Sequence, residues 1–208
     1  MLILIPAAGA SSRMRGRDKL LELIDYQPLL ARQVSIALRA EANVVVALPP
    51  DRPDRTAIVE GMVADRLDML MVDDADEGMS ASIRAAVCFA TKRGAKGMMI
   101  LPADMPEIEV DDLIRMTHAF DGSNVVRATD MNGQAGHPVI FPARLFRALS
   151  GLGGDQGARV VMVGEKVDTV PLPGLRATTD LDTPEDWDAW RLRTGRQRPS
   201  WKRNNPGL

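Results

Sequence analysis

The sequence predicts an α/β fold in which helices cover both faces of a largely parallel sheet, as a three-layer sandwich. Two observations lead to this prediction. Short runs of apolar, often β-branched residues alternate along the chain with segments of helical periodicity. The 208 residues, 45% hydrophobic and 26% charged, also have the composition of a globular domain with a sizeable core.

Each expected strand is a short apolar run of the kind found in sheets that are buried on both faces. The expected strands are residues 2–5, 43–48, 68–72, 97–101, 124–128, 137–141 and 167–172. The helical segments repeat apolar residues three and four positions apart. The expected helices are residues 28–40, 56–65, 80–94, 110–120, 143–152 and 184–193. Because no internal repeat or long linker divides the chain, we expect one domain over residues 1–194.

Charge is distributed unevenly along the chain. The net charge is −2, yet the last 18 residues hold six Lys and Arg and no acid, so the rest of the chain is clearly acidic. An acidic body is a poor surface for nucleic acid, and we expect no nucleic-acid partner. Residues 195–208 form a basic C-terminal tail that we expect to be mobile, with a basic contact arm as the alternative.

The sequence also predicts a compartment. The single cysteine, Cys88, lies at helical spacing among Ala, Val and Phe, which excludes a disulfide framework and favours a buried thiol. No uninterrupted apolar run has the length needed to cross a bilayer, and the N-terminal run ends at Pro6 with no basic residue before it. We therefore expect a cytoplasmic protein without a membrane partner.

The segment after the first expected strand has the features of an anion site. Ligands of open α/β sheets bind at the carboxyl ends of the strands. The small residues of "AAGASS", 7–12, would let backbone N–H groups approach an anion, and Arg13 and Lys19 add positive charge. The dinucleotide pattern G-x-G-x-x-G and the P-loop Lys-Ser/Thr are both missing. A polyphosphate site is predicted, and a surface turn with scattered cations is the alternative.

Three aspartates are candidate metal ligands. Asp104 follows the fourth expected strand within three residues, where a carboxylate could hold Mg²⁺ at the same sheet edge. Asp180 and Asp182 come just before Thr183 and Pro184, which have the character of a helix N-cap and first position. Capping would account for one aspartate but hardly for both. The three could form one metal site if the fold brings them together.

Two further segments carry polar residues at expected strand ends. Gly78, Ser80 and Ser82 lead into a helix, where Ser80 is a candidate N-cap and Gly78 a turn residue. Alternatively, this edge contacts the ribose or base of a nucleotide. His137 opens the sixth expected strand, and a structural histidine is the alternative to a binding role. Asp155 and Arg159 flank a glycine-rich turn.

Six motifs occur in one order along residues 2 to about 190: "AAGASSRMRGRDKLL", "GMSAS", "ADMP", "GHP", "GDQGAR" and "DLDTPED". With this set the chain resembles the nucleotidyltransferases of molybdenum cofactor synthesis, the MobA-like NTP transferases, and among them the cytidylyltransferases. The resemblance implies a Rossmann-like nucleotidyltransferase fold with a mostly parallel, mixed sheet. The extra residue in "RMRG" and the segment "DYQPLL" depart from the family pattern, so we expect an altered loop shape with retained chemistry.

The resemblance also implies roles for individual residues. Arg13 and Lys19 would contact the phosphates of the nucleotide, and Asp104 would bind the catalytic Mg²⁺ with Asp182 or Asp180 as a second carboxylate. The implied nucleotide-binding residues are Ala7, Ala8, Gly9, Ser11, Ser12, Gly78, Ser80 and Ser82. The residues that would face the pterin substrate are His137, Asp155 and Arg159.

The implied reaction is transfer of CMP from CTP to the terminal phosphate of the molybdopterin cofactor, with release of pyrophosphate. The pair Ala8 and Gly9 points to CTP, because Ala-Gly accompanies cytidine nucleotides in this family and Gly-Gly accompanies guanosine nucleotides. The alternatives are a guanylyltransferase, a related enzyme with another phosphate acceptor, and a carrier of the finished cofactor. A molybdoenzyme or its maturation factor would be the protein partner.

Overall fold

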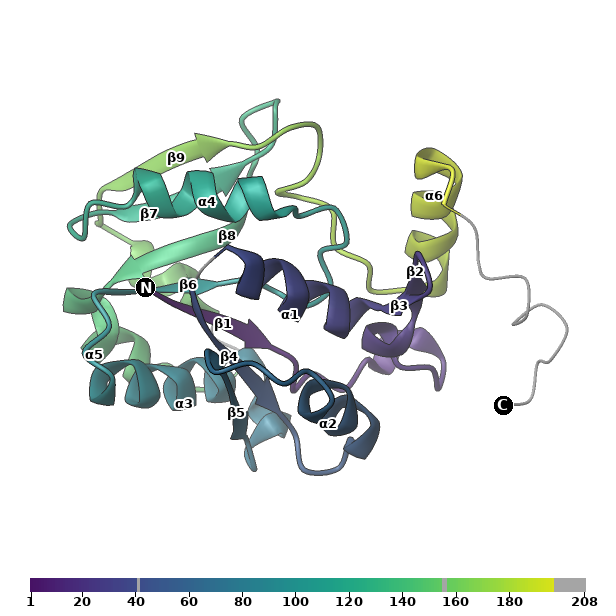
Figure 1. The fold of residues 1–208 in the computed structure, drawn as a ribbon. Helices are drawn as coiled ribbons and strands as arrows, with labels where there is room; N and C mark the ends of the chain where they lie inside the picture. The colour runs from purple at the N-terminus through teal and green to yellow at the C-terminus, as the bar shows by residue number, and fades with distance from the viewer. Residues whose placement is uncertain (41, 155–156, 197–208) are drawn as a thin grey trace, which may run out of the picture.

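The computed structural model describes residues 1–40, 42–154 and 157–196, and within them the chain forms a central mixed sheet (Figure 1). Its strands are β1 (Leu2–Pro6), β4 (Asn43–Leu48), β5 (Leu67–Met71), β6 (Gly97–Ile100), β7 (Val125–Thr129), β8 (Ala135–Pro142) and β9 (Val167–Pro171). The strand order is β5-β4-β1-β6-β8-β7-β9, and β8 alone among these strands runs antiparallel to its neighbours. The predicted α/β fold with a mostly parallel, mixed sheet is confirmed.

The single antiparallel strand follows from a tight turn between β7 and β8. One carboxylate oxygen of Asp130 accepts the backbone N–H groups of Asn132 and Gln134, at 2.8 and 2.9 Å. Gly133 has a φ of 79°, which suits a residue without a Cβ. So short a turn can join only antiparallel strands, whereas the parallel neighbours are joined through helices.

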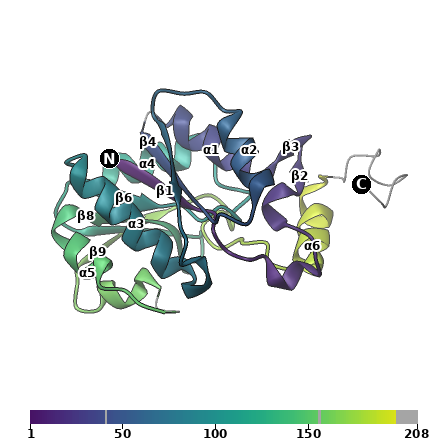
Figure 2. The same cartoon turned by 90° about the horizontal axis from the view of Figure 1, so that it is seen from below.

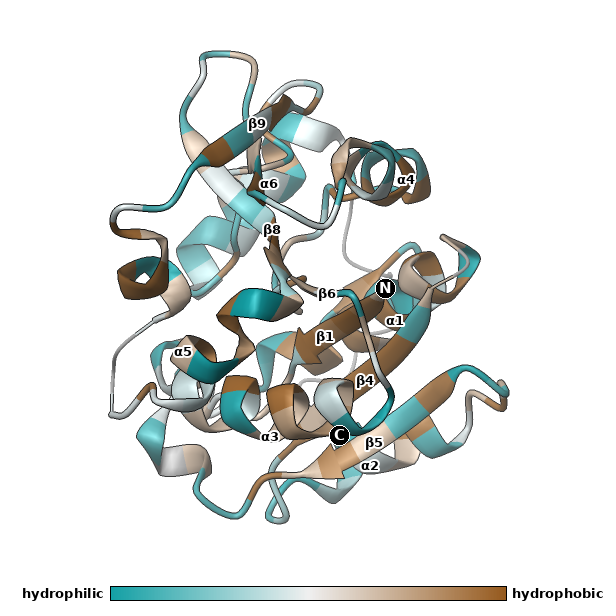
Figure 3. Ribbon diagram, turned by 90° about the vertical axis from the view of Figure 1, so that its left-hand side faces the viewer, coloured by the Kyte–Doolittle hydropathy of each residue, from teal (hydrophilic) through white to brown (hydrophobic). Residues whose placement is uncertain are grey.

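The helices pack on both faces of the sheet (Figure 2). They are α1 (Leu29–Arg39), α2 (Pro53–Glu60), α3 (Met79–Lys92), α4 (Val110–Ala119) and α5 (Phe146–Ser150). A further helix, α6 (Pro184–Thr194), lies to one side of the sheet (Figures 1 and 2). Ile3 and Ile5 of β1 pack in one hydrophobic cluster with α1, α2 and α4, and Leu2 and Leu4 pack in another with α3 and α5. Both faces of β1 are therefore buried, and Figure 3 shows β1 and β4 as apolar along their lengths.

Most expected elements agree with the structure within two residues, but two helices differ. The helix expected over 56–65 begins at Pro53 and ends at Glu60. Proline suits the first helical position because its missing N–H has no intrahelical acceptor there. The helix expected over 143–152 is divided into a 3₁₀ turn at 143–145 and α5.

A small hairpin that the sequence did not predict lies beside α6 (Figures 1 and 2). It consists of β2 (Leu23–Ile24) and β3 (Gln27–Pro28). Asp25 and Tyr26 connect them with φ angles of 49° and 68°, as in the two-residue turns that match the twist of a hairpin. The unusual segment "DYQPLL" forms this hairpin, and Arg191 of α6 forms an ion pair of 3.1 Å with the neighbouring Glu22.

The prediction of a buried Cys88 is wrong, because its side chain is exposed. The buried face of α3 contains Ile83, Ala86, Val87 and Ala90. Each helical residue is turned by about 100° from the one before it, so Cys88 lies beside this face and not on it. The spacing indicated the helix correctly but not the side of the helix on which the thiol lies.

Two further observations concern the ends of the chain and its helices. Among the described residues, the structure has no helix that combines the length and the apolar character needed to cross a membrane. The helix α6 ends at Thr194, and residues 197–208 of the predicted basic tail lie outside the described residues.

Candidate active site

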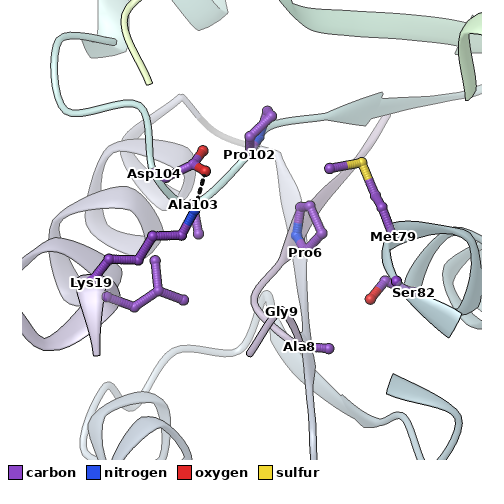
Figure 4. A pocket seen from close by; sticks show the side chains of 11 residues that line it. Pro6, Ala8, Gly9, Lys19, Met79, Ser82, Pro102, Ala103 and Asp104 are labelled. Carbon is purple, nitrogen blue, oxygen red and sulfur yellow. Dashed lines mark hydrogen bonds and ion pairs between the residues drawn. The ribbon is translucent and has the colours of Figure 1, made fainter. Parts of the chain in front are cut away.

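A cavity of about 160 Å³ lies at the carboxyl ends of β1 and β6 (Figure 4). The loop after β1 forms one wall, the segment after β6 forms a second, and the start of α3 forms a third. The lining residues are Pro6, Ala8, Gly9, Lys19, Leu20, Gly78, Met79, Ser82, Pro102, Ala103 and Asp104. Three of the predicted segments, from the motifs "AAGASS", "GMSAS" and "ADMP", therefore meet at one pocket.

A chain of ion pairs joins the predicted cations to the predicted metal ligands. Nζ of Lys19 lies 2.6 Å from a carboxylate oxygen of Asp104 and 2.6 Å from one of Asp182. The other carboxylate oxygen of Asp182 lies 2.6 Å from Nη1 of Arg13. Figure 4 shows the Lys19 side chain extended toward Asp104 at the pocket wall. The fold brings these four residues together from three distant parts of the sequence.

A backbone contact explains why the segment of Asp182 lies beside that of Asp104. The N–H of Leu181 donates to the carbonyl of Asp104 at 3.1 Å, which fixes the two segments against each other. Thr183 is the N-cap of α6, and its hydroxyl accepts the N–H of Asp186, as the sequence predicted for this threonine. Since Thr183 caps the helix, the side chain of Asp182 is free of that role.

The segment that carries Asp104 is also held from α1. The buried side chain of Gln33 donates to the carbonyl of Met105. Arg32 donates to the carbonyl of Pro106 at 3.3 Å and forms an ion pair of 2.6 Å with Glu109. These contacts attach the Asp104 segment to a helix of the sandwich, so its carboxylate has a defined position.

Arg55 of α2 organises the loop after β1, and its side chain is fully buried. Nη1 donates to the carbonyls of Ala7 and Gly9 at 2.6 and 2.8 Å. Nε and Nη2 donate to the carboxylate of Asp18 at 2.7 and 2.9 Å, and Nη2 also donates to the hydroxyl of Ser11 at 3.1 Å. All five N–H donors of a guanidinium are thus used on this loop. Sequence analysis missed Arg55, since no motif surrounds it.

Charge and burial set the protonation states at the pocket. Burial alone would lower the pKa of Lys19, but the negative charge of Asp104 and hydrogen bonds to Asp104 and Asp182 raise it above its ordinary value of 10.5. Lys19 therefore stays a cation. Partial burial, followed by the negative charge of Asp104, raises the pKa of Asp180 above 3.8. Asp180 and Asp104 line one pocket, and the three-aspartate metal site stays a prediction.

Asp104 and Asp182 are the candidate carboxylates for a divalent cation that shares its coordination with a substrate. Among the described residues, no group of three or more His, Cys, Asp or Glu side chains is arranged to hold a metal by itself. However, the ammonium of Lys19 lies between oxygens of Asp104 and Asp182, so a cation is already accommodated there. Mg²⁺ commonly binds one or two protein carboxylates together with substrate phosphates and water. The pair Asp104 and Asp182 has this character.

The other predicted nucleotide-binding residues divide into two groups. Ala8, Gly9, Gly78 and Ser82 line the pocket. The others do not line it. The carbonyl of Ala7 and the hydroxyl of Ser11 accept hydrogen bonds from Arg55. Ser12 is exposed, and Ser80 is fully buried.

The prediction of Ser80 as a helix N-cap is wrong. The N-cap of α3 is Gly78, whose φ is 74°, and the helix begins at Met79. The hydroxyl of Ser80 instead donates to the carbonyls of Glu77 and Gly154, at 3.0 and 2.7 Å. Ser80 therefore joins the start of α3 to the segment that precedes residues 155–156.

A second pocket of about 270 Å³ adjoins the first and shares Met79, Pro102 and Asp104 with it. Its other lining residues are Met105, Arg127, Gln134, Ala135, Gly136, His137, Ala177, Thr178 and Asp180. Of the predicted substrate-binding residues, His137 lines this pocket. Arg159 is exposed on a 3₁₀ turn at 158–162, and Asp155 lies outside the described residues.

Burial, followed by the positive charge of Arg127, lowers the pKa of His137 below 6.5, so its imidazole is uncharged at neutral pH. The second pocket is therefore lined by a neutral histidine together with the carboxylates of Asp104 and Asp180 and the cation of Arg127. The two pockets differ in the charged side chains that line them, because the first contains the ion pair of Lys19 and Asp104 and the second contains Arg127.

The loop after β1, the paired cations and carboxylates, and two adjoining pockets at the carboxyl edge of the sheet form the arrangement that the sequence predicted for a nucleotidyltransferase. The model of the MobA-like NTP transferase domain matches residues 3–170, and the chain belongs to this family. A relative of known sequence is the purine catabolism protein PucB of Bacillus subtilis. It is 27% identical over 196 residues, which cover 89% of this chain and 93% of PucB.

Solved structures share the fold. Rv0371c from Mycobacterium tuberculosis H37Rv superimposes with a TM-score of 0.78 at 24% identity, covering 91% of this chain and 97% of that one. The same mycobacterial protein is known in complex with manganese. CMP:2-keto-3-deoxy-manno-octonic acid synthetase complexed with CTP gives a TM-score of 0.71 at 16% identity, covering 93% of this chain and 98% of the synthetase.

Proposed function

We propose that this nucleotidyltransferase moves CMP from CTP to the terminal phosphate of the molybdenum cofactor and releases pyrophosphate. One observation carries the proposal: Lys19 and Asp104, paired at 2.6 Å, stand where two pockets share a wall. A cation and a metal-binding carboxylate at this junction suit a reaction between two phosphates. The choice of the cofactor as acceptor rests on the resemblance of six ordered motifs to the enzymes of its synthesis.

Each pocket takes one substrate. CTP occupies the first pocket, where the backbone of residues 7–12 approaches the phosphates and Ala8 narrows the space beside the base. Gly78 and Ser82 lie on the opposite wall of the same pocket. The acceptor occupies the second pocket, beside His137, with Asp155 and Arg159 as further contacts. Below, these are called the nucleotide pocket and the acceptor pocket.

The reaction needs no nucleophile from the protein. An oxygen of the acceptor phosphate attacks the α-phosphorus of CTP, a new P–O bond forms, and the bond from that phosphorus to the bridging oxygen breaks. Pyrophosphate takes the electron pair and leaves. Lys19 and Arg13 neutralise the charge that builds on pyrophosphate, and backbone N–H groups of the loop hold the α-phosphate in place.

Asp104 and Asp182 would hold Mg²⁺ against the phosphates of the nucleotide, with Asp180 as a nearby third carboxylate. When bound, the ion draws charge from the phosphate oxygens and orients them. The manganese complex of the mycobacterial structure supports a divalent cation in proteins of this fold.

The proposal is tested by pyrophosphate release from the purified protein with Mg²⁺ and molybdenum cofactor, offering CTP, GTP, ATP and UTP separately. Release with CTP alone supports the proposal. A preference for GTP would make the protein a guanylyltransferase. If the protein binds the cofactor but releases pyrophosphate from none of the nucleotides, a carrier role is favoured. If pyrophosphate is released only with another phosphate compound as acceptor, the proposed acceptor is wrong and the reaction type stands.

Two variants make this assay specific. Asp104→Asn removes the carboxylate at the junction and is expected to abolish turnover without unfolding the protein, whereas Asp65→Asn, an exposed carboxylate far along the chain from the motifs, leaves turnover unchanged. Ala8→Gly removes one methyl group from the nucleotide pocket and is expected to raise the use of GTP relative to CTP.

A further inference from the structure

Arg127 of β7 places a cation at the acceptor pocket, and this cation has no anionic partner in the part of the chain that the structure describes. The side chain is partly buried and lines the pocket. Nε donates to the carbonyl of Gly136 at 3.1 Å. Within residues 1–40, 42–154 and 157–196, the two terminal nitrogens have no hydrogen bond and no ion pair. A partly buried guanidinium loses hydration, so open donors of this kind favour an anionic ligand.

The guanidinium is held on rigid backbone. A Cβ on Gly136 would lie 1.8 Å from the carbonyl oxygen of Ala177, so only glycine allows the two segments to approach. The N–H of His137 also donates to that carbonyl at 2.8 Å. Because Nε of Arg127 is bonded to the carbonyl of Gly136, the side chain is oriented by a strand and its neighbouring segment. Its terminal edge has the geometry that binds two oxygens of a phosphate together.

The charged groups near Arg127 also bear on which kind of ligand its open donors would bind. Burial and then the positive charge of Arg159 lower the pKa of Arg127. His137 is uncharged at neutral pH for the reasons given above. The carboxylates that line the same pocket are Asp104 and Asp180, and Asp104 is paired with Lys19. The acceptor pocket is thus lined by one cation, Arg127, and by the carboxylates of Asp104 and Asp180.

We propose that Arg127 forms an anion subsite that holds a phosphate group of the acceptor. The inference rests on the proposed function and deepens it, since it makes a phosphate monoester the class of acceptor. Arg127 is a binding residue in this role, because its terminal nitrogens contact the phosphate. The phosphate is held in the acceptor pocket, which shares Asp104 with the nucleotide pocket.

The first test compares Arg127→Met with Arg115→Met, an exposed arginine of α4 used as the matched control. Pyrophosphate release is measured while the concentrations of CTP and molybdenum cofactor are varied separately. We expect Arg127→Met to raise the KM of the cofactor about tenfold to a hundredfold and to leave the KM of CTP within about twofold. Equal changes in both constants, or no change in either, would overturn the subsite.

A second test is independent of the acceptor's identity. Inorganic phosphate is titrated by calorimetry into protein saturated with CTP and Mg²⁺. We expect binding to the wild type that Arg127→Met weakens about tenfold or more and Arg115→Met leaves unchanged. Equal binding by all three proteins, or none by the wild type, contradicts the subsite. If phosphate binding depends on Arg127 but the cofactor is not a substrate, the proposed acceptor is wrong and the subsite stands.

Loss of stability is checked by thermal unfolding of each variant. If Arg127→Met does not fold, Arg127→Lys replaces it, because lysine keeps the charge but cannot bind two oxygens through a planar edge. We then expect weaker phosphate binding than in the wild type. Unchanged affinity in Arg127→Lys would show that only the charge is needed and would overturn the proposed two-oxygen contact.

Discussion

The guanidinium of Arg55 donates two hydrogen bonds to the carboxylate of Asp18, 2.7 Å from Nε to Oδ2 and 2.9 Å from Nη2 to Oδ1. Asp18 also accepts the N–H of Leu20 at 3.0 Å and so caps the 3₁₀ turn that carries Lys19. The same guanidinium holds the carbonyl of Gly9 at 2.8 Å. Arg55 therefore links the pocket wall at Gly9 to the turn that presents Lys19, although it does not line the pocket itself.

Arg55→Met is expected to lower stability and to weaken nucleotide binding. The change leaves the carboxylate of Asp18 buried without its cation, which costs about 3–5 kcal/mol of unfolding free energy. Urea unfolding measures the stability, and the KM of CTP in pyrophosphate release measures binding. The matched control is Arg66→Met at an exposed position, whose effect is expected to stay within about 0.5 kcal/mol.

Arg55→Met combined with Asp18→Leu separates stability from positioning. Removing both charges avoids the unpaired buried carboxylate, so we expect part of the stability to return. The loop still lacks its donors, and the KM of CTP is expected to stay high. If this KM returns to the wild-type value together with stability, Arg55 stabilises the fold without positioning the loop.

Much of the fold was predictable because its strands and helices repeat local patterns. The run at 43–48 is apolar after Asn43 and becomes β4, whose apolar residues are buried between two layers of helices. The exposed Cys88 and the N-cap at Gly78 were mispredicted, since one residue of rotation or shift along a helix depends on packing partners that periodicity does not contain. The β2–β3 hairpin depends on left-handed residues other than glycine, which carry no strong sequence signal.

The site was partly predictable for a different reason. Lys19, Asp104 and Asp182 each belong to a recognisable motif, but their contact depends on the bond between Leu181 and Asp104, which joins distant segments. Arg55 and Arg127 have no motif around them. Their importance comes from burial and from the backbone carbonyls that surround them, and both arise only in the folded chain.

Lys19→Met is expected to lower kcat/KM for CTP about 10²-fold to 10³-fold, the usual cost of removing a donor that stabilises developing charge. The methionine fills a similar volume but leaves Asp104 and Asp182 without the cation between them. Steady-state pyrophosphate release gives the measurement, with Lys92→Met, an exposed lysine of α3, as the control. A variant that keeps wild-type kinetics would remove Lys19 from the reaction.

Two glycines are expected to respond in opposite ways to alanine. A Cβ on Gly9 meets no protein atom within 4 Å, so Gly9→Ala is expected to unfold at the wild-type temperature or slightly above it. Its methyl group would enter the nucleotide pocket, and we expect the KM of CTP to rise about tenfold or more. Gly136→Ala places a Cβ 1.8 Å from the carbonyl of Ala177 and is expected to destabilise the protein. An unchanged KM in Gly9→Ala would mean that the nucleotide does not approach this backbone.

Asp180→Asn is expected to stabilise the protein at neutral pH while it weakens the metal site. Partial burial and then the charge of Asp104 raise the pKa of Asp180 in the folded state above its unfolded value of 3.8. The folded state therefore binds the proton more tightly, and ionisation of Asp180 costs stability as the pH rises through the raised pKa. Because the side chain is exposed at the pocket rim, the gain is small, about 1–2 °C in Tm at pH 7.

The pH dependence of that gain identifies its cause. Below both pKa values Asp180 is protonated in the folded and unfolded states, so the advantage of asparagine is expected to shrink as the pH falls toward 4. Thermal unfolding of wild type, Asp180→Asn and the exposed control Asp65→Asn from pH 4 to pH 8 measures it. If asparagine instead helps more at pH 4 than at pH 8, the pKa of Asp180 is lowered by the fold. Asp180 would then be stabilised as an anion near Lys19, which would place it among the paired carboxylates with Asp104 and Asp182.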